Sequence, residues 1–224
     1  MIEICDLRFR WPRADADTLH IDQLTVKTGE AVFLFGPSGC GKSTLLGLLA
    51  GVLLASQGSV SVLGVDWAAL PAGRRDSARA DHVGFIFQQF NLLPYLSVRD
   101  NVLLPCRFSA ARARRAGPLQ AAAETLLARV GLPQRLWALP AAELSVGQQQ
   151  RVAAARALIG TPELVIADEP TSALDAALRD SFMDLLLGAC RAAGSTLVFV
   201  SHDERLAARF DRRLSLPDIN RCVA

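Results

Sequence analysis

The chain carries, directly after the apolar run 31–35 (AVFLF), the stretch Gly36-Pro37-Ser38-Gly39-Cys40-Gly41-Lys42-Ser43-Thr44. A continuous apolar run of this kind predicts a strand that is buried on both faces. The glycines allow the backbone to curl so that successive N–H groups point inward at an anion. After Lys42 the apolar pattern becomes helical, and a helix N-terminus adds the positive end of its dipole. The order of strand, glycine loop and helix therefore predicts a phosphate-binding site.

The same stretch fits the P-loop pattern G-x-x-x-x-G-K-[ST]. In such a loop Lys42 reaches the β- and γ-phosphates, the Ser43 hydroxyl binds Mg²⁺ and Thr44 lies near the α-phosphate. The alternative is a glycine turn that carries a lysine by chance. The strand before the loop and the helix after it argue against that alternative, so the sequence predicts a nucleotide and Mg²⁺ as ligands.

Composition limits the classes of protein that this chain can belong to. Its 224 residues suit one domain, or one core with a smaller lobe, and a 51% hydrophobic content excludes a disordered chain. A net charge of +2 argues against a main role in holding a nucleic-acid backbone. No segment reaches the roughly 20 apolar residues that span a bilayer, and the N-terminus has no signal-peptide pattern. The five cysteines lack metal-ligand spacing, which indicates reduced thiols.

Apolar runs and helical periodicity alternate along most of the chain. Strands are expected at 31–35, 83–87, 164–167 and 196–200, each followed by helical or polar sequence. Such alternation predicts an α/β fold with a mostly parallel sheet. From about 90 to 156 the strand signals vanish and prolines, Pro105 among them, divide the sequence into short helices. We therefore predict an inserted α-helical lobe at about 90–156, with the core formed by 1–89 and 157–224.

Two acids follow the apolar run at 164–167. Asp168, at the strand end, is placed to hold the Mg²⁺ shell as in other P-loop NTPases. Glu169 comes next and points elsewhere, so it can polarise an attacking water as a general base. Two solvated acids are the alternative, which the P-loop upstream disfavours. A water-activating glutamate is not needed by a small-molecule kinase, and the Asn-Lys-x-Asp signature of GTPases is absent.

With these motifs, the chain resembles the ATP-binding cassette (ABC) ATPase family, and six motifs in the family's order carry the resemblance. Leu144-Ser145-Val146-Gly147-Gln148 is similar to the family signature L-S-G-G-Q, with Val146 in place of the first glycine. The resemblance implies that Ser145, Gly147 and Gln148 contact the γ-phosphate of ATP held by a second subunit. A capped amphipathic helix is the alternative, and it explains Ser145 but not the whole string.

The other motifs assign further residues by the same resemblance. Gln88 matches the glutamine that touches Mg²⁺ and the attacking water, with the neighbouring Gln89 as the alternative. His202 matches the histidine that contacts the γ-phosphate. Ser172-Ala173-Leu174-Asp175 is similar to the loop that couples the two sites of the dimer, and implies that Asp175 contributes to nucleotide binding. Trp11 lies where the family stacks an aromatic ring on adenine, with Phe9 as the alternative.

The resemblance implies a P-loop NTPase (RecA-like) core with an N-terminal antiparallel β part and the inserted helical lobe. It further implies an Mg-dependent ATPase that forms a homodimer on ATP binding and drives a separate integral membrane permease, from the cytoplasmic face of the membrane. An ATP-dependent regulatory or mechanotransmission module without transport is the second hypothesis. A soluble ATPase of DNA repair or translation is the third, and no nucleic-acid partner is expected. The string 84–94 (GFIFQQFNLLP) is similar to the branch of lipoprotein-release, macrolide-export and cell-division ATPases.

One basic cluster has no place in these motifs. It consists of Arg107, Arg112, Arg114 and Arg115. A solvated helix face is the simplest interpretation, contact with anionic lipid headgroups is the second, and contact with nucleic acid is the third.

Overall fold

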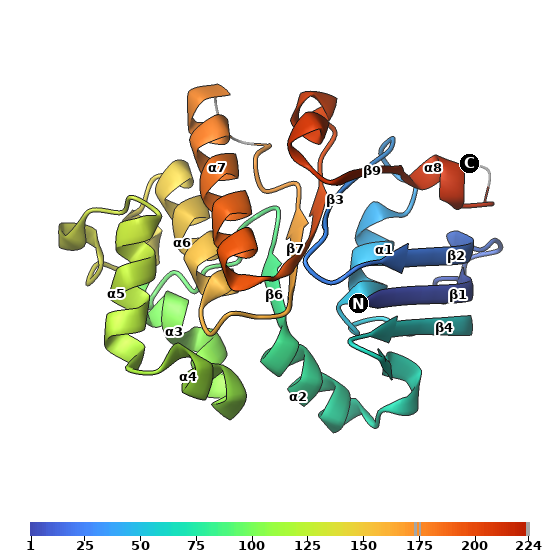
Figure 1. The fold of residues 1–224 in the computed structure, drawn as a ribbon, viewed down its shortest axis with the longest axis horizontal. Helices are drawn as coiled ribbons and strands as arrows, with labels where there is room; N and C mark the ends of the chain where they lie inside the picture. Colours follow the sequence, from blue (N-terminus) through green and yellow to red (C-terminus); the bar gives the residue numbers. More distant parts are fainter. Residues whose placement is uncertain (173, 175, 223–224) are drawn as a thin grey trace.

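Two β-sheets enclose one helix between them (Figure 1). The computed structural model describes residues 1–172, 174 and 176–222 of the chain. The strands are β1 (Ile2–Phe9), β2 (Leu19–Val26), β3 (Ala31–Phe35), β4 (Gln57–Val62), β5 (Val65–Asp66), β6 (Val83–Ile86), β7 (Leu164–Asp168), β8 (Thr196–Val200) and β9 (Arg212–Ser215). The α-helices are α1 (Lys42–Leu49), α2 (Ala72–His82), α3 (Val98–Phe108), α4 (Ala110–Ala116), α5 (Leu119–Arg129), α6 (Val146–Leu158), α7 (Ala176–Ala193) and α8 (Leu216–Ile219). Short 3₁₀ helices are η1 (Trp67–Ala69), η2 (Gln134–Leu136), η3 (Ala141–Glu143) and η4 (Glu204–Arg209).

The N-terminal sheet is antiparallel and has the strand order β2-β1-β4-β5. Its central strand β1 changes register against β4 between Cys5 and Arg8, and Asp6 there has a φ of 48°. Gly58 on β4 meets this irregularity, since a Cβ at Gly58 would lie 2.2 Å from the Asp6 carbonyl oxygen. Only glycine fits so close to a neighbouring backbone. The antiparallel pairing of these strands confirms the predicted N-terminal antiparallel part.

The second sheet is parallel throughout, in the order β6-β7-β8-β3-β9. Strands β3, β7 and β8 are buried almost from end to end, as expected for a sheet covered on both faces. The carboxyl ends of β3, β6, β7 and β8 consequently lie along one edge, where ligands bind in such folds. The predicted α/β fold with a mostly parallel sheet is confirmed.

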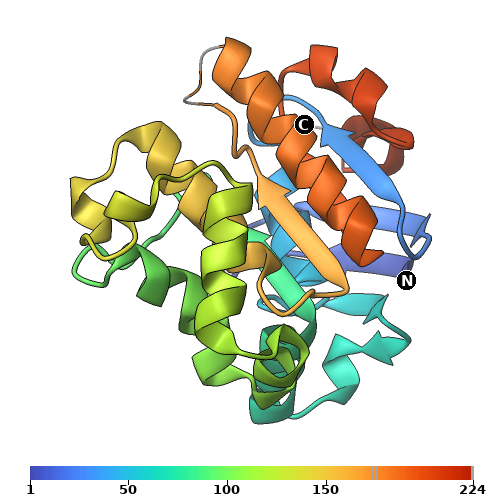
Figure 2. The ribbon, with the colours of Figure 1, turned by 60° about the vertical axis from the view of Figure 1, so that its left-hand side comes forward.

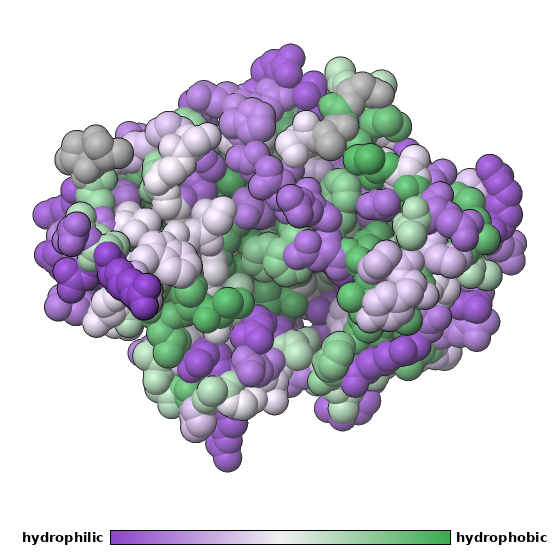
Figure 3. All heavy atoms as spheres, turned by 180° about the vertical axis from the view of Figure 1, so that it is seen from behind, coloured by the Kyte–Doolittle hydropathy of each residue, from purple (hydrophilic) through white to green (hydrophobic). Residues whose placement is uncertain are grey.

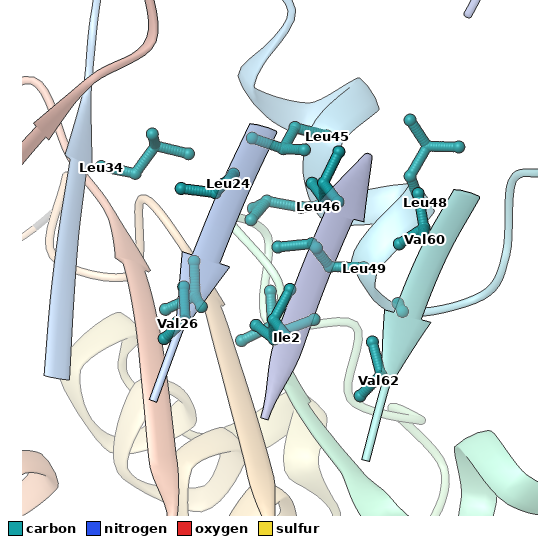
Figure 4. Close-up of a cluster of buried hydrophobic side chains, with 14 of the residues drawn as sticks. Ile2, Leu24, Val26, Leu34, Leu45, Leu46, Leu48, Leu49, Val60 and Val62 are labelled. Carbon is teal, nitrogen blue, oxygen red and sulfur yellow. The ribbon is translucent and has the colours of Figure 1, made fainter. Parts of the chain in front are cut away.

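Helix α1 fills the space between the two sheets. Its leucines Leu45, Leu46 and Leu49 are at most 2% exposed, and they pack against Ile2 and Leu34 among others (Figure 4). Because α1 follows the glycine loop directly, burial of its apolar side chains fixes the position of that loop.

Helices α6 and α7 cover the opposite face of the parallel sheet (Figure 2). Ala154 of α6 and Met183 of α7 pack with Phe33 and Phe199 of the strands. On its other side, α6 packs with α3 and α5 through Val152, Val102 and Leu127. Helix α6 thus packs both on the parallel sheet and on the helical part of the molecule, by which we mean α3, α4, α5 and the segments that join them to one another and to α6.

The structure differs from the sequence-based expectation in two details. Strand β6 ends at Ile86, which is its last residue paired with β7, and Phe87 lies beyond it with 38% of its surface exposed. Pro105 does not end a helix but lies inside α3. A proline in a helix removes one N–H donor and disfavours the helix, and here the packing of Val102 and Cys106 in the helical core keeps α3 continuous.

Candidate active site

The glycine loop joins the carboxyl end of β3 to the N-terminus of α1. Gly39 and Gly41 have φ values of 82° and 102°, in the region that favours glycine. Among the described residues, no side chain caps the N-terminus of α1, and its first turn contains no acid. The first N–H groups of this helix are therefore free to bind an anion.

Lys42 folds back over the same loop. Its Nζ donates hydrogen bonds to the carbonyl oxygens of Gly36 and Pro37, each at 2.8 Å. The ammonium group thereby lies above the loop at the place where phosphate groups would enter. A point charge with three donors suits the β- and γ-phosphates of a nucleotide.

Ser43 and Asp168 bring two oxygen ligands together. The Ser43 hydroxyl donates to Oδ2 of Asp168 at 3.2 Å, so the start of α1 meets the end of β7. Burial raises the pKa of Asp168, and the hydrogen bond from Ser43 opposes that rise. Hydroxyl and carboxylate oxygens are the ligands that Mg²⁺ prefers, so the pair fits a magnesium ion bound next to nucleotide phosphates.

Glu169 and His202 form the second polar pair of the site. Glu169 has a φ of 44°, and its N–H donates to the carbonyl of Val200 at 3.0 Å. Its backbone is thus in the left-handed region, and Oε2 of its side chain lies 3.2 Å from Nδ1 of His202. Strain of this kind in a non-glycine residue is typical of functional sites.

One cleft of about 540 Å³ gathers most of the predicted residues. Its lining comes from the glycine loop, from the ends of β6 and β7, and from the segment before β2, and consists of Trp11, Thr18, Ser38, Gly39, Gly41, Lys42, Ser43, Thr44, Gln88, Asp168 and Glu169. Trp11 is 45% exposed and meets Phe9 edge to face, with ring centroids 5.2 Å apart. Phe9 itself is buried, so of the two aromatic candidates only Trp11 offers a ring to a ligand.

The signature residues lie outside this cleft. Ser145 caps α6 by accepting a hydrogen bond from the N–H of Gln148, and Oε1 of Gln148 accepts one from the N–H of Ser145. A Cβ at Gly147 would meet only Leu174 and Leu178, at ordinary contact distances of 3.9 Å. Contacts within the described protomer thus give no reason for glycine at this position. Asp175 and Ala173 of the predicted coupling loop lie outside the described residues.

Asn220 is a site residue that the sequence did not reveal. Its Oδ1 accepts from the N–H of His20 at 2.8 Å and of Cys222 at 3.2 Å, and its Nδ2 donates to the carbonyls of Thr18 (3.1 Å) and Cys40 (3.4 Å). This buried amide ties the glycine loop to the edge of the cleft. Three of its partners, His20, Thr18 and Cys40, lie about 180 to 200 residues away in the sequence, and no local pattern marks it.

A second, larger groove of about 780 Å³ is lined by α1 and the segment after it, by α2, α3, α4 and α6, and by β6 and the end of β7. Hydrophobic side chains surround a hollow in the middle of this face (Figure 3), and Val52, Phe87 and Phe108 of its lining are exposed. Arg112 and Arg156 also line it.

Arg112 corrects the interpretation of the basic cluster as a solvated helix face. It is 2% exposed, and its guanidinium donates to the carbonyls of Val83, Ala157 and Ile159. Burial lowers its pKa to about 10. Its long side chain points from α4 into the core because three carbonyl groups there offer acceptors for its donors, whereas the neighbouring Arg114 is exposed.

Comparison with known proteins agrees with this geometry. The sequence profile of the family described as "ABC transporter" matches residues 19–172. The chain is 46% identical over 194 residues to "Uncharacterized ABC transporter ATP-binding protein YbbA" of Escherichia coli (strain K12), covering 87% of this chain and 83% of that protein. It is also 46% identical over 200 residues to "Lipoprotein-releasing system ATP-binding protein LolD" of Anaeromyxobacter dehalogenans (strain 2CP-C), covering 89% and 82%.

A solved structure shares the fold as well. It is described as "Dimeric structure of a post-hydrolysis state of the ATP-binding cassette MJ0796 bound to ADP and Pi", with a TM-score of 0.86, 33% identity and coverage of 96% of this chain and 94% of that one. The resemblance to the branch that contains the lipoprotein-release ATPases is thus confirmed. The glycine loop at 36–44, the start of helix α6 at Ser145 and the acids Asp168 and Glu169 follow one another in the family's order. The chain belongs to the ABC transporter family of ATP-binding proteins and is an ATPase.

Proposed function

We propose that this chain is the Mg-dependent ATP-hydrolysing subunit of an ABC transporter, which dimerises on ATP and drives a separate membrane permease. One observation carries the proposal: a single cleft is lined by the phosphate loop, by Asp168 and by Glu169, while the signature helix begins outside it. A nucleotide bound in that cleft leaves its γ-phosphate open to a second protomer.

Within the cleft the residues have separate tasks. The N–H groups at the start of α1 and the ammonium of Lys42 bind the phosphates. Ser43, Asp168 and Gln88 would hold Mg²⁺, which neutralises charge on the β- and γ-phosphates when bound. Glu169 takes a proton from the attacking water, and His202 beside it contacts the γ-phosphate. Trp11 stacks on the adenine ring.

The second protomer supplies the rest of the site. Ser145, Gly147 and Gln148 are placed at the exposed start of α6, where a helix N-terminus attracts negative charge. The dimeric form and bound ADP and Pi of the related cassette MJ0796 support this arrangement. Asp175 is assigned to the contact between the two sites by the motif alone.

The membrane partner is proposed to dock on the larger groove. Among the described residues no helix has the length and apolar character that crossing a bilayer requires. The exposed apolar side chains of the groove suit a helix of a permease, and Gln88 lies next to it. We propose that this docking holds the chain at the cytoplasmic face of the membrane, with the helical lobe at about 90–156 as the part that meets the permease.

One observation favours the second hypothesis, a regulatory or mechanotransmission module without transport. Val146 stands at the exposed start of α6, where the family has glycine, and half of its surface is accessible. In a dimer, the Val146 side chain would lie where the γ-phosphate held by the partner approaches, and this bulk favours slow ATP turnover. Slow turnover suits a regulatory module that signals through ATP-driven dimerisation.

Co-purification tests the proposal directly. Tagged full-length Glu169→Gln protein is isolated from its own membranes with MgATP, and the proteins that accompany it are identified. Lys42→Ala protein, which lacks the ammonium for the phosphates, serves as the control. We expect a membrane-spanning permease with the first protein and much less with the second. Recovery of no membrane protein in either case would contradict the proposed partnership.

A further inference from the structure

The segment that follows β6 turns at Phe90 and Asn91 before it enters the helical part, and we call these two residues the corner. Phe90 and Asn91 both have φ in the left-handed region, at 59° and 48°. Neither is a glycine, so each conformation costs energy and must be held by its surroundings. Gln88, which lines the nucleotide cleft, is two residues before this corner.

Arg156 of α6 holds the corner in place. Its Nη1 donates to the carbonyl of Asn91 at 2.7 Å, and its Nη2 donates to the carbonyl of Phe90 at 2.5 Å. The planar guanidinium presents two donors at a fixed spacing, so it fixes both carbonyls together. A lysine in the same place has one nitrogen and reaches such a pair less well.

This contact involves a buried positive charge. Arg156 is 9% exposed, and in the described part of the chain no carboxylate forms an ion pair with it. Burial lowers its pKa. Because an unpaired buried charge is costly, an apolar side chain of similar size would serve packing alone better. The two carbonyls are therefore the contact that the guanidinium provides at this position.

The same helix is tied to the other end of β6. Arg112 of α4 donates to the carbonyl of Val83, where β6 begins, and to those of Ala157 and Ile159, where α6 ends. Strand β6 and the segment with Gln88 are thus connected to α6 at both ends. The opposite end of α6 is the signature start at Ser145.

We propose that Arg156 is a positioning residue that fixes Gln88 in the nucleotide cleft and makes it move together with the signature helix. The inference rests on the proposed contact of Gln88 with the magnesium shell and the attacking water. Since Arg156 also lines the larger groove, a permease docked there would act on Gln88 and on α6 through one side chain.

A double-mutant cycle on the full-length protein tests this. ATP hydrolysis (kcat and KM) and the Kd of ATP are measured for Gln88→Ala, Arg156→Met, Arg156→Lys and the combination of Gln88→Ala with Arg156→Met. We expect Arg156→Met to lower kcat about tenfold, since a small displacement of a positioned group costs up to roughly 10²-fold, with the Kd of ATP unchanged. Arg156→Lys is expected to recover part of the rate. The double variant should be no slower than Gln88→Ala, because both changes affect the same step.

Arg151 provides a matched control on the same helix. It also donates to two carbonyls, those of Val130 and Gly131, but these belong to the helical part and not to the corner. Arg151→Met should keep the wild-type kcat. If Arg156→Met does not fold, as judged by its thermal unfolding, the cycle is run with Arg156→Lys.

The possible results distinguish a failure of the role of Arg156 from a failure of the role of Gln88. Wild-type turnover by the Arg156 variant, or losses that multiply in the double variant, overturns the positioning role while Gln88 keeps its own. Wild-type turnover by Gln88→Ala alone overturns the proposed role of Gln88, and the inference with it. A raised Kd of ATP in Arg156→Met with unchanged kcat also contradicts the proposal, since it indicates general loosening of the site.

Discussion

Nδ1 of His202 lies 3.2 Å from Oε2 of Glu169, across the gap between the ends of β8 and β7. The two residues are far apart in the sequence, and the parallel pairing of β7 with β8 brings them to the same edge. The carboxylate of Glu169 contacts the histidine, whereas that of Asp168 accepts a hydrogen bond from Ser43. The two acids at the end of β7 therefore have different surroundings and can take different tasks.

Glu169→Gln should abolish steady-state hydrolysis and leave an ATP-bound dimer. Glutamine keeps the shape and the contact with His202 but cannot accept a proton, and a general base contributes about 10²- to 10⁴-fold. Phosphate release gives the rate, and size-exclusion chromatography with MgATP gives the dimer. Glu163→Gln, just before β7 at its opposite end, is the control and should keep the wild-type rate. Hydrolysis by Glu169→Gln at that rate would contradict the assignment.

Asn220→Ala should weaken nucleotide binding. The change removes the donors of the Cys40 and Thr18 carbonyls, and each lost buried partner costs about 1–3 kcal/mol. Because Cys40 belongs to the glycine loop, we expect the Kd of ATP to rise several-fold, measured by a fluorescent nucleotide. Asn101→Ala removes another buried amide, which holds Leu93 instead. That variant should lose stability and keep its Kd; an unchanged Kd for Asn220→Ala as well would refute the role.

Alkylation of Cys40 should block nucleotide binding. Its thiol lies under the loop, where a Cβ at Gly36 would be only 2.8 Å from Sγ, so an added group displaces the backbone. MgATP should slow labelling of Cys40 but not of the exposed Cys5 on β1, as followed by peptide mass spectrometry. Burial raises the pKa of Cys190 to about 12, so its reactive thiolate is scarce and it should stay unlabelled. Equal labelling of Cys40 with and without nucleotide is the contrary result.

Arg112→Met should lower the free energy of unfolding by at least about 2 kcal/mol, because three buried carbonyls lose their donor. Arg114→Met, on the exposed side of α4, is the matched control and should have little effect in the same denaturant titration. The pKa of Arg112, lowered to about 10, still leaves it charged at neutral pH. As the pH rises, the folded state loses this proton at a lower pH than the unfolded state does. The free-energy cost of burying the charge is therefore relieved only above about pH 10. The difference between wild type and Arg112→Met should accordingly be constant from about pH 6 to 8, and a steep change there would contradict this account.

Local patterns determined much of the molecule. The apolar run before Gly36 and the glycines after it are sufficient for strand, loop and helix, because burial on two faces and positive φ are local demands. The acids after 164–167 and the polar residues after the other strands share one edge, since parallel strands bring their carboxyl ends together. The cleft that contains Lys42, Gln88, Asp168 and Glu169 lies at this edge.

Only the tertiary structure decided what the arginines and Asn220 do. In the sequence Arg112 and Arg114 are two members of one basic cluster. In the structure Arg112 is buried and donates hydrogen bonds to backbone carbonyls, whereas Arg114 is exposed. Arg156 and Asn220 belong to no local pattern that identifies their partners. The partners of Arg156 in the corner lie about 65 residues away, and those of Asn220 at the cleft lie about 180 to 200 residues away. Hydrogen bonds to backbone carbonyls depend on where distant segments come to lie, and residue type does not encode that. The sequence by itself therefore determined the elements and the chemistry at their ends, while packing decided which side chains connect that chemistry to the rest of the molecule.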